Sequence, residues 1–378
     1  MKQHLGRNAV TGLALFTLLG GGQALFGPSL PSFQAIHGLS VPEAGLILTF
    51  YWMGGLSAVL LILVPGLAAL MRWRAGFASA LLALGCFGVS DSGAWPLALA
   101  GAALMGAGHG LLTVGLNGFF AASFGARTPV LLNLLNAMFG VGAVGAPILL
   151  VSLGGDVEAV FRVLALCFCL LLPVAVMLDD RAGGEVARAS AGFASLIRTA
   201  RTHAFFLVLM GIAVGLEVAI VGWGVTVLSA ALMPLDEART FTSFFYVSFT
   251  CARLAAVGLS FRVQPSHFVL GGFLSAVALL IVANSGGTFA GYAFALLGFS
   301  IGPLFPNLFA WAAPLIAKEP PLSALVICAG MLGGIAGPTL LSSLGSLLGQ
   351  GYAFYALAAI ALFASVMVTI FLRTGRGQ

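Results

Sequence analysis

Long apolar stretches dominate this sequence and restrict it to one class of fold. A helix of roughly 20 apolar residues crosses a bilayer core about 30 Å thick. Twelve such stretches, separated by glycine, proline or charge, lie at about residues 9–33, 41–70, 74–91, 95–124, 129–153, 159–178, 203–233, 239–261, 265–284, 288–317, 321–348 and 352–372. The chain is therefore predicted to be an all-α membrane protein with twelve transmembrane helices.

The charge content excludes other classes. Only 7% of the residues are charged, against about 25% in soluble domains, so a soluble enzyme is excluded. The net charge of +5 is scattered singly between apolar stretches, which argues against a nucleic-acid partner. The five cysteines lie in apolar segments without metal-ligand spacing, and no nucleotide loop or catalytic triad is visible. We therefore expect neither an enzyme nor a cofactor or metal.

The basic residues predict the orientation. Two basic residues outside the membrane, Arg162 and Arg239, fall on one side, and Arg253 lies within a stretch. The other side carries thirteen: Lys2, Arg7, Arg72, Arg74, Arg127, Arg181, Arg188, Arg198, Arg201, Arg262, Lys318, Arg373 and Arg376. Because positive loops stay in the cytoplasm, both termini are expected there.

The chain divides into two halves that share a repeat. A hydrophilic linker at 181–202 separates a bundle at 1–180 from a bundle at 203–378, each with six predicted helices. The segment 142–154 aligns with 333–345 at an offset of 191 residues, which pairs Pro147 with Pro338. Two pseudo-symmetric six-helix bundles are therefore expected.

Four short segments resemble a known family: residues 127–142, 215–223, 245–253 and 298–307. They are similar to the branch of the major facilitator superfamily that includes L-fucose and related sugar–proton symporters. The resemblance implies the major facilitator fold, a solute site near the midplane between the two bundles, alternating access, and a bacterial inner membrane location. We expect a monomer whose partners are a small solute, protons and the bilayer.

The sequence also departs from that family. The loop after the second stretch keeps Gly66, Arg72 and Arg74 but lacks the usual acidic residue. Where the sugar symporters carry an acidic residue in helix one or four, this chain has Gln23 and Thr113. The resemblance therefore carries over neither fucose nor the family's proton site.

A few polar residues lie deep in the stretches, where an ionisable group indicates function. Counted at 1.5 Å per residue, Gln23, His109, Glu217 and Tyr246 lie roughly 20 Å from the cytoplasmic end. Asn117 and Asn307 lie at roughly 10 to 15 Å by the same count. Gln23 and Asn307 are predicted to bind solute, because their stretches line the cavity in the superfamily that the chain resembles. Tyr246, near the midplane, is the leading candidate to stack on solute among the aromatic residues, which otherwise form the interfacial belt: Tyr51, Trp52, Trp223, Tyr246 and Trp311.

Glu217 is the one carboxylate deep in any stretch, so we predict that it carries the coupling proton and contacts solute. A static ion pair with Arg253 is the alternative. Arg253 pairs with Glu217 or holds helix-end carbonyls. His109 relays a proton or binds solute hydroxyls, or it donates as a neutral imidazole to a carbonyl of a neighbouring helix.

Two asparagines, Asn117 and Asn136, fall at similar depth on consecutive stretches. They bind solute or hydrogen-bond between helices. Asn133, one turn nearer the cytoplasm than Asn136, is predicted to be structural.

These patterns predict a secondary transporter of a small polar solute such as a sugar, coupled to protons. The alternative is an exporter of drugs or amphipathic metabolites from the same superfamily, favoured by the aromatic residues and the sparse polar content.

Overall fold

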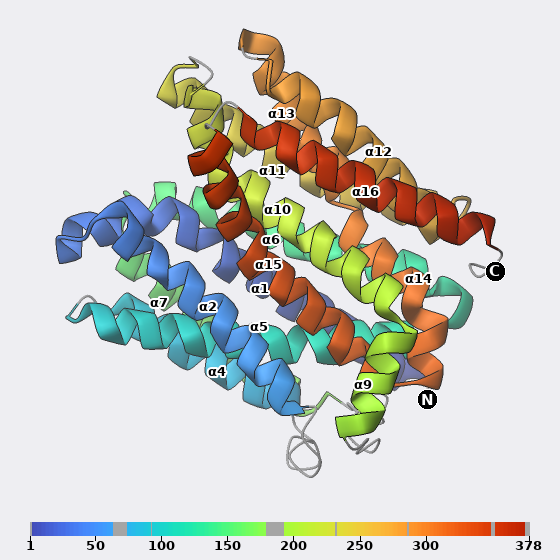
Figure 1. Ribbon diagram of the computed structural model, residues 1–378. Coiled ribbons are helices and arrows are strands. Elements are labelled where there is room, and N and C mark those ends of the chain that lie inside the picture. Colours follow the sequence, from blue (N-terminus) through green and yellow to red (C-terminus); the bar gives the residue numbers. More distant parts are fainter. Residues whose placement is uncertain are drawn as a thin grey trace. The chain divides into compact units, whose positions relative to one another are not determined.

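The computed structural model describes residues 2–62, 74–91, 93–178, 193–230, 233–285, 287–348 and 352–374, and all regular secondary structure in these ranges is helical (Figure 1). The helices are α1 (Lys2–His37), α2 (Val41–Ile62), α4 (Arg74–Ser90), α5 (Trp95–Ser123), η1 (Gly125–Arg127), α6 (Thr128–Ser152), α7 (Val157–Val176), α9 (Phe193–Thr202), α10 (Ala204–Ala230), α11 (Leu235–Leu259), α12 (Pro265–Ala283), α13 (Gly287–Ile301), α14 (Leu304–Lys318), α15 (Pro321–Leu348) and α16 (Ala353–Arg373).

The helices agree with the predicted membrane spans. Ten helical segments in the described residues are long and apolar enough to cross a membrane. Two shorter apolar helices, Ala75–Ser90 and Ser243–Leu259, match the third and eighth predicted stretches. Each predicted stretch thus contains one apolar helical segment, and the predicted fold class is confirmed. The loop residues 66–73 and the linker residues 181–192 lie outside the described part of the chain.

The tenth predicted span differs from expectation because two helices, α13 and α14, occupy it. Proline has no backbone N–H, so Pro303 and Pro306 cannot donate to the carbonyls four residues earlier. One of those carbonyls belongs to Gly302, at the break. The predicted single helix is therefore interrupted, and Gly302 keeps an acceptor for another partner.

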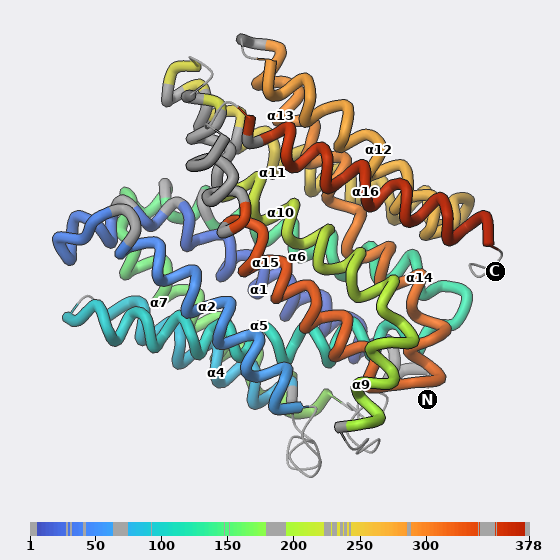
Figure 2. The backbone as a smooth tube through the Cα atoms, viewed as in Figure 1, coloured from blue at the N-terminus to red at the C-terminus, as the bar shows by residue number. Residues whose placement is uncertain are grey.

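Figure 2 traces the backbone from the N-terminus to the C-terminus, and the described residues form two compact units. Unit 1 comprises residues 1–128, 138–203 and 313–328, and unit 2 comprises residues 129–137, 204–312 and 329–378. The first turns of α6 therefore pack with helices of the second half of the sequence, and the first turns of α15 pack with helices of the first half.

In unit 1, helix α5 packs against α2 and α4. A Cβ at Gly106 of α5 would overlap the carbonyl oxygen of Tyr51 on α2, and one at Gly54 of α2 would overlap the carbonyl oxygen of Ala103. Only glycine permits this approach on both sides. The α2–α5 crossing is thereby fixed beside Tyr51.

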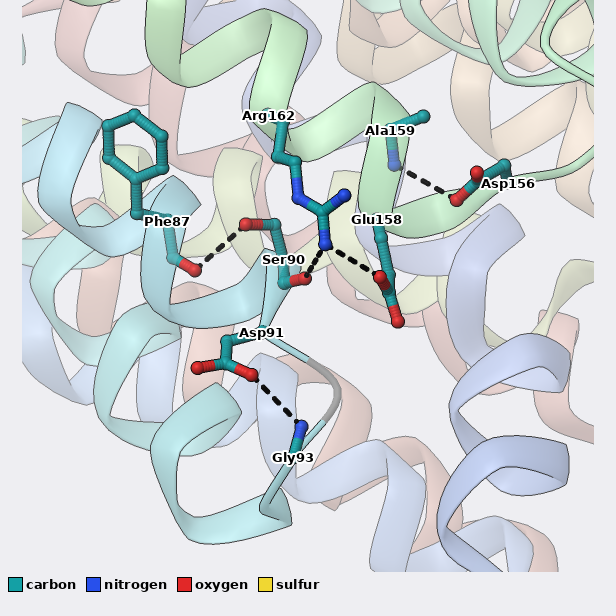
Figure 3. A network of polar contacts seen from close by, with 8 residues as sticks. All are labelled: Phe87, Ser90, Asp91, Gly93, Asp156, Glu158, Ala159 and Arg162. Carbon is teal, nitrogen blue, oxygen red and sulfur yellow. Dashed lines mark hydrogen bonds and ion pairs between the residues drawn. The ribbon is translucent and has the colours of Figure 1, made fainter.

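The ends of the unit 1 helices carry local polar contacts. Asp156 caps α7 by accepting from the backbone N–H of Ala159 at 2.9 Å (Figure 3). The Arg162 guanidinium joins Glu158, at 2.7 Å, to the carbonyl of Ser90 at the end of α4, at 3.4 Å. These contacts lie at exposed helix ends, where ion pairs contribute little to stability.

The predicted linker at 181–202 contains helix α9 in its described part. The Thr199 hydroxyl on α9 donates to the Glu319 carboxylate at 2.9 Å, and His203 Nε2 lies 3.4 Å from the other oxygen of Glu319. Helix α9 is thus tied to the short connection between α14 and α15.

In unit 2, helix α13 packs against α11 and α12, and α12 packs against α16. A Cβ at Gly298 of α13 would overlap the carbonyl oxygen of Phe245 on α11, and a Cβ at Gly302 would lie 2.6 Å from the carbonyl oxygen of Phe249. The two glycines bring the α13–α14 break against α11, next to Arg253.

Candidate functional site

Two buried polar clusters contain most of the predicted site residues. The Arg253 cluster comprises Glu217, Tyr246, Phe249 and Arg253 of unit 2, together with the carbonyls of Asn136 and Gly302. The His109 cluster comprises Tyr51, Trp52, His109 and Phe139 of unit 1. Each cluster lies within one compact unit.

Arg253 is 4% exposed and holds helix carbonyls. Its Nε donates to the carbonyl of Gly302 at 2.8 Å, and its Nη1 donates to the carbonyl of Asn136 at 3.1 Å. The first of these is the carbonyl that Pro306 leaves without a helical donor. The guanidinium carbon also lies 4.0 Å from the ring centroid of Phe249, one turn earlier on α11. Arg253 therefore links α11, the α13–α14 break and the start of α6.

Glu217 faces the same guanidinium. Its Oε2 lies 3.9 Å from Nη2 of Arg253, which is an ion pair without a hydrogen bond. Within the described residues no hydrogen bond holds either carboxylate oxygen, and the side chain is 19% exposed. Arg253 therefore makes both predicted kinds of contact, the ion pair with Glu217 and the hydrogen bonds to helix carbonyls. The Glu217 carboxylate can still accept hydrogen bonds.

Tyr246 is half-buried and lies one turn before Thr250, whose hydroxyl donates to the Tyr246 carbonyl at 2.9 Å. Seven residues, about two turns of α11, separate Tyr246 from Arg253, so both side chains lie on the same face of that helix. The structure thus places Tyr246, Glu217 and Arg253 in one cluster.

Asn307 and Asn133 form a reciprocal amide pair, which we call the amide tie. The Asn307 Nδ2 donates to Asn133 Oδ1 at 3.1 Å, and Asn133 Nδ2 donates to Asn307 Oδ1 at 3.2 Å. Each Nδ2 also donates to a carbonyl four residues earlier, that of Pro303 or Pro129, at 2.8 Å. Both side chains are fully buried, so Asn307 holds α14 to α6.

The other two predicted asparagines bond to their own helices. Asn117 Nδ2 donates to the carbonyl of Thr113, and Asn136 Nδ2 donates to the carbonyl of Leu132, each at 2.9 Å. Both asparagines are buried and make further contacts. Their roles in solute binding stay predictions, as does that of Asn307.

In the His109 cluster, the Tyr51 hydroxyl lies 2.5 Å from Nδ1 of His109. The ring centroids of Trp52 and Phe139 each lie 6.2 Å from that of His109. Tyr51 and His109 are buried, whereas Trp52 and Phe139 are half-buried. His109 was predicted, as one alternative, to donate to a backbone carbonyl of a neighbouring helix. Its hydrogen-bond partner is the Tyr51 hydroxyl instead.

Gln23 lies half-buried on α1 in unit 1. Its amide has no hydrogen bond to any group in the described part of the chain. Its predicted contact with solute is compatible with this environment but stays a prediction.

Sequence reasoning missed Gly302, Phe249 and Phe139 as members of these clusters. One signal was available for Gly302, since the two prolines in residues 303–306 free carbonyls that need donors. The aromatic neighbours depend on helix rotation, which the sequence pattern leaves open.

Solved structures provide the comparison with known proteins, since no family model and no curated protein matches the sequence. The chain is 18% identical to the Escherichia coli fucose–proton symporter FucP, with 96% of this chain and 98% of that chain covered and a TM-score of 0.71. It is 12% identical to the proton–xylose symporter XylE, with 98% and 96% covered and a TM-score of 0.72. It is 15% identical to the human organic anion transporter MFSD10, with 96% and 99% covered and a TM-score of 0.73.

Identities this low establish the fold and leave the solute open. The likeness extends over nearly the whole chain and includes the symporter type that the four segments resemble. The chain is therefore a multi-pass membrane protein with the fold of major facilitator superfamily transporters.

Proposed function

We propose that this protein is a secondary transporter that moves a small polar solute by alternating access, coupled to protons through Glu217. The observation that carries the proposal is the Glu217–Arg253 pair, a partly exposed carboxylate 3.9 Å from a buried guanidinium. The proposal places the protein as a monomer in a bacterial inner membrane, with bundles at 1–180 and 203–378 and both termini and the linker at 181–202 in the cytoplasm.

Proton coupling requires a group that can be charged or neutral at similar cost in different states. Attraction to Arg253 favours the charged carboxylate, and burial among apolar helices favours the neutral acid. Because no hydrogen bond within the described residues fixes the carboxylate, a small displacement of Arg253 changes this balance.

The Arg253 contacts supply such a displacement. Protonation of Glu217 removes the attraction on Nη2 and leaves Arg253 with the carbonyls of Gly302 and Asn136. These carbonyls belong to the α13–α14 break and to α6, elements that must move in alternating access. The proton on Glu217 is thereby coupled to a helix break.

Glu217→Gln tests the proposal because glutamine imitates the neutral acid in size and hydrogen bonding. In proteoliposomes with an imposed pH gradient, the variant should lose uphill solute accumulation while retaining solute binding and exchange. Glu43→Gln is the matched control, since Glu43 is an exposed helix-end carboxylate bonded to Ser40, and it should accumulate solute normally. Accumulation by Glu217→Gln at the wild-type rate would exclude Glu217 as the coupling group.

The second candidate, export of amphipathic compounds, is favoured by the aromatic rings around His109. A thermal-stability screen of the purified protein against sugars, organic acids and cationic drugs separates the two, because a bound ligand raises the melting temperature.

A further inference from the structure

The contact between His109 and Tyr51 follows from the crossing of α2 and α5. Gly106, three residues before His109, lets the α5 backbone reach the carbonyl of Tyr51. The imidazole then lies against the phenol, with the ring centroids 5.5 Å apart and a hydrogen bond of 2.5 Å. Backbone packing, not a flexible loop, holds both side chains in place.

This bond assigns the proton on the imidazole. The Tyr51 side chain is 2% exposed, and Nδ1 of His109 is the only hydrogen-bond partner of its hydroxyl within the described residues. A buried hydroxyl hydrogen without an acceptor is costly, so the hydroxyl donates to Nδ1. A neutral imidazole that accepts at Nδ1 carries its hydrogen on Nε2.

The Nε2–H group has no hydrogen-bond acceptor among the described residues. It is also not one of the fully buried unpaired polar atoms in the described part of the chain, so it keeps accessible surface. His109 as a whole is 8% exposed. A single donor is therefore open to a ligand on an otherwise buried ring.

The surroundings of this donor are aromatic and uncharged. The ring centroids of Trp52 and Phe139 each lie 6.2 Å from that of His109, and both residues are half-buried. No hydrogen bond or ion pair joins His109 to a charged side chain in the described residues. A charged ligand would lose its hydration here without gaining a counter-ion.

We propose that Tyr51, Trp52, His109 and Phe139 form a subsite for an uncharged, hydroxylated ring such as a monosaccharide. A ring oxygen or hydroxyl accepts from Nε2–H of His109, and the apolar C–H face of the ring lies on Trp52. Tyr51 is a positioning residue, because its bond to Nδ1 keeps the hydrogen on Nε2. This subsite rests on the proposed transport function and specifies its solute class.

The test measures equilibrium binding to the purified full-length protein, which requires no transport. D-glucose, D-galactose, D-xylose and L-fucose are the neutral probes, and D-glucuronate and D-glucosamine are the charged cyclic counterparts. Ligand-induced shifts in melting temperature, titrated against concentration, give an apparent Kd for each variant. The wild type should bind at least one neutral sugar more tightly than either charged compound.

Variants separate the roles within the subsite. His109→Leu and Trp52→Ala should each weaken binding about tenfold or more, since each removes one of the principal contacts. His109→Gln, whose amide N–H imitates Nε2–H, should stay within about threefold of the wild type, and Tyr51→Phe should fall between these values. Trp95→Phe is the matched aromatic control, because Trp95 packs on Phe33 and His37 away from the cluster.

The possible outcomes are decisive. Unchanged sugar binding in both His109→Leu and Trp52→Ala would overturn the subsite. Preference for D-glucuronate or D-glucosamine, or no binding of any neutral sugar, would overturn the uncharged class. If His109→Leu unfolds, loss of binding in folded Trp52→Ala with binding retained in His109→Gln still supports the subsite. Gradient-driven uptake tests the proposed function separately. If the protein transports solute but the His109 and Trp52 variants still bind sugar, the subsite is disproved and the proposed function is not.

Discussion

Helix α6 approaches α1 at Gly142 in unit 1, and α15 approaches α10 at Gly333 in unit 2. A Cβ at Gly142 would overlap the carbonyl oxygen of Thr17, and one at Gly333 would overlap that of Gly211. These two glycines are the residues that the repeat aligns at an offset of 191. The two units thus use the same close approach between corresponding helices.

Their polar clusters differ. Unit 1 contains a neutral His109–Tyr51 pair among aromatic rings, whereas unit 2 contains the Glu217–Arg253 ion pair at a helix break. A neutral pair suits contact with an uncharged solute, and an ion pair suits exchange of a proton. The two units therefore share a packing position and differ in their buried chemistry.

The largest expected loss of stability comes from removing a buried charge, and removal of an exposed charge should cost much less. Arg253→Met leaves Glu217 without its cation and the Gly302 carbonyl without its donor, so stability should fall by about 3 to 5 kcal/mol. Arg162→Met removes an exposed pair with a carboxylate on the same helix and should cost at most about 1 kcal/mol. Melting temperatures of the purified variants measure both.

Adding Glu217→Gln to Arg253→Met removes the uncompensated carboxylate and should recover part of the loss. If Arg253→Met lowers stability no more than Arg162→Met does, the buried ion pair in unit 2 contributes no more to stability than the exposed pair in unit 1.

The aligned glycines test the shared packing. Gly142→Ala and Gly333→Ala should each cost about 1 to 3 kcal/mol or more, because the added carbon forces two backbones apart. Gly145→Ala is the control, since open space surrounds its Cβ position and alanine favours a helix. Thermal unfolding should show similar losses for the first two and none for the third. A loss at one aligned glycine alone would break the parallel between the units.

The amide tie is a second buried polar contact of unit 2 whose contribution to stability can be measured. Asn133→Leu or Asn307→Leu should each cost about 1 to 3 kcal/mol, because the remaining amide is fully buried without its partner. The double variant should cost less than the sum of the two, since no orphaned amide remains. Unfolding of the three variants gives the coupling energy, and strictly additive losses would show that the two amides act independently.

The smallest expected effect concerns Glu319 in unit 1. The hydrogen bond from Thr199 holds the pKa of Glu319 below its ordinary value, with His203 and Arg198 contributing and partial burial opposing. A carboxyl with a lowered folded-state pKa stabilises the fold fully above its ordinary pKa, about 4.3, and loses this contribution as the pH falls through the lowered value.

Acidification from pH 6 to below 4 should therefore loosen α9, by a small amount because Glu319 is 44% exposed. Hydrogen exchange of residues 193–202, corrected for intrinsic rates, measures this change. Glu319→Gln should remove the pH dependence, and an unchanged profile in that variant would assign the effect to another group.

Much of the scaffold was predictable from residues alone. Apolar length predicted the spans, since a bilayer admits only segments whose backbone groups bond internally. The repeat aligns Gly142 with Gly333, and in the structure both lie where two helices approach too closely for any side chain. The division of the tenth span was missed, although Pro303 and Pro306 were visible in the sequence.

The site was less predictable, and the asparagines show why. Asn307 was predicted to bind solute and Asn133 to be structural, but depth along the helix was the main argument for either role. Their reciprocal bond requires α6 and α14 to present one face each to the other within 3.2 Å. Helical rise specifies how deep a residue lies, and it does not specify which neighbour that face meets.

The sequence by itself determined the membrane class, the twelve spans, the repeat and the single deep carboxylate, because each depends on composition and spacing along the chain. The tertiary structure alone decided that Arg253 bonds to the carbonyl freed by Pro306, that His109 meets the Tyr51 hydroxyl, and that Asn307 meets Asn133. These partners lie 49, 58 and 174 residues apart in the sequence. Hydrogen bonds act over about 3 Å, so partners are chosen by helix rotation and by the glycine contacts that set how closely helices approach.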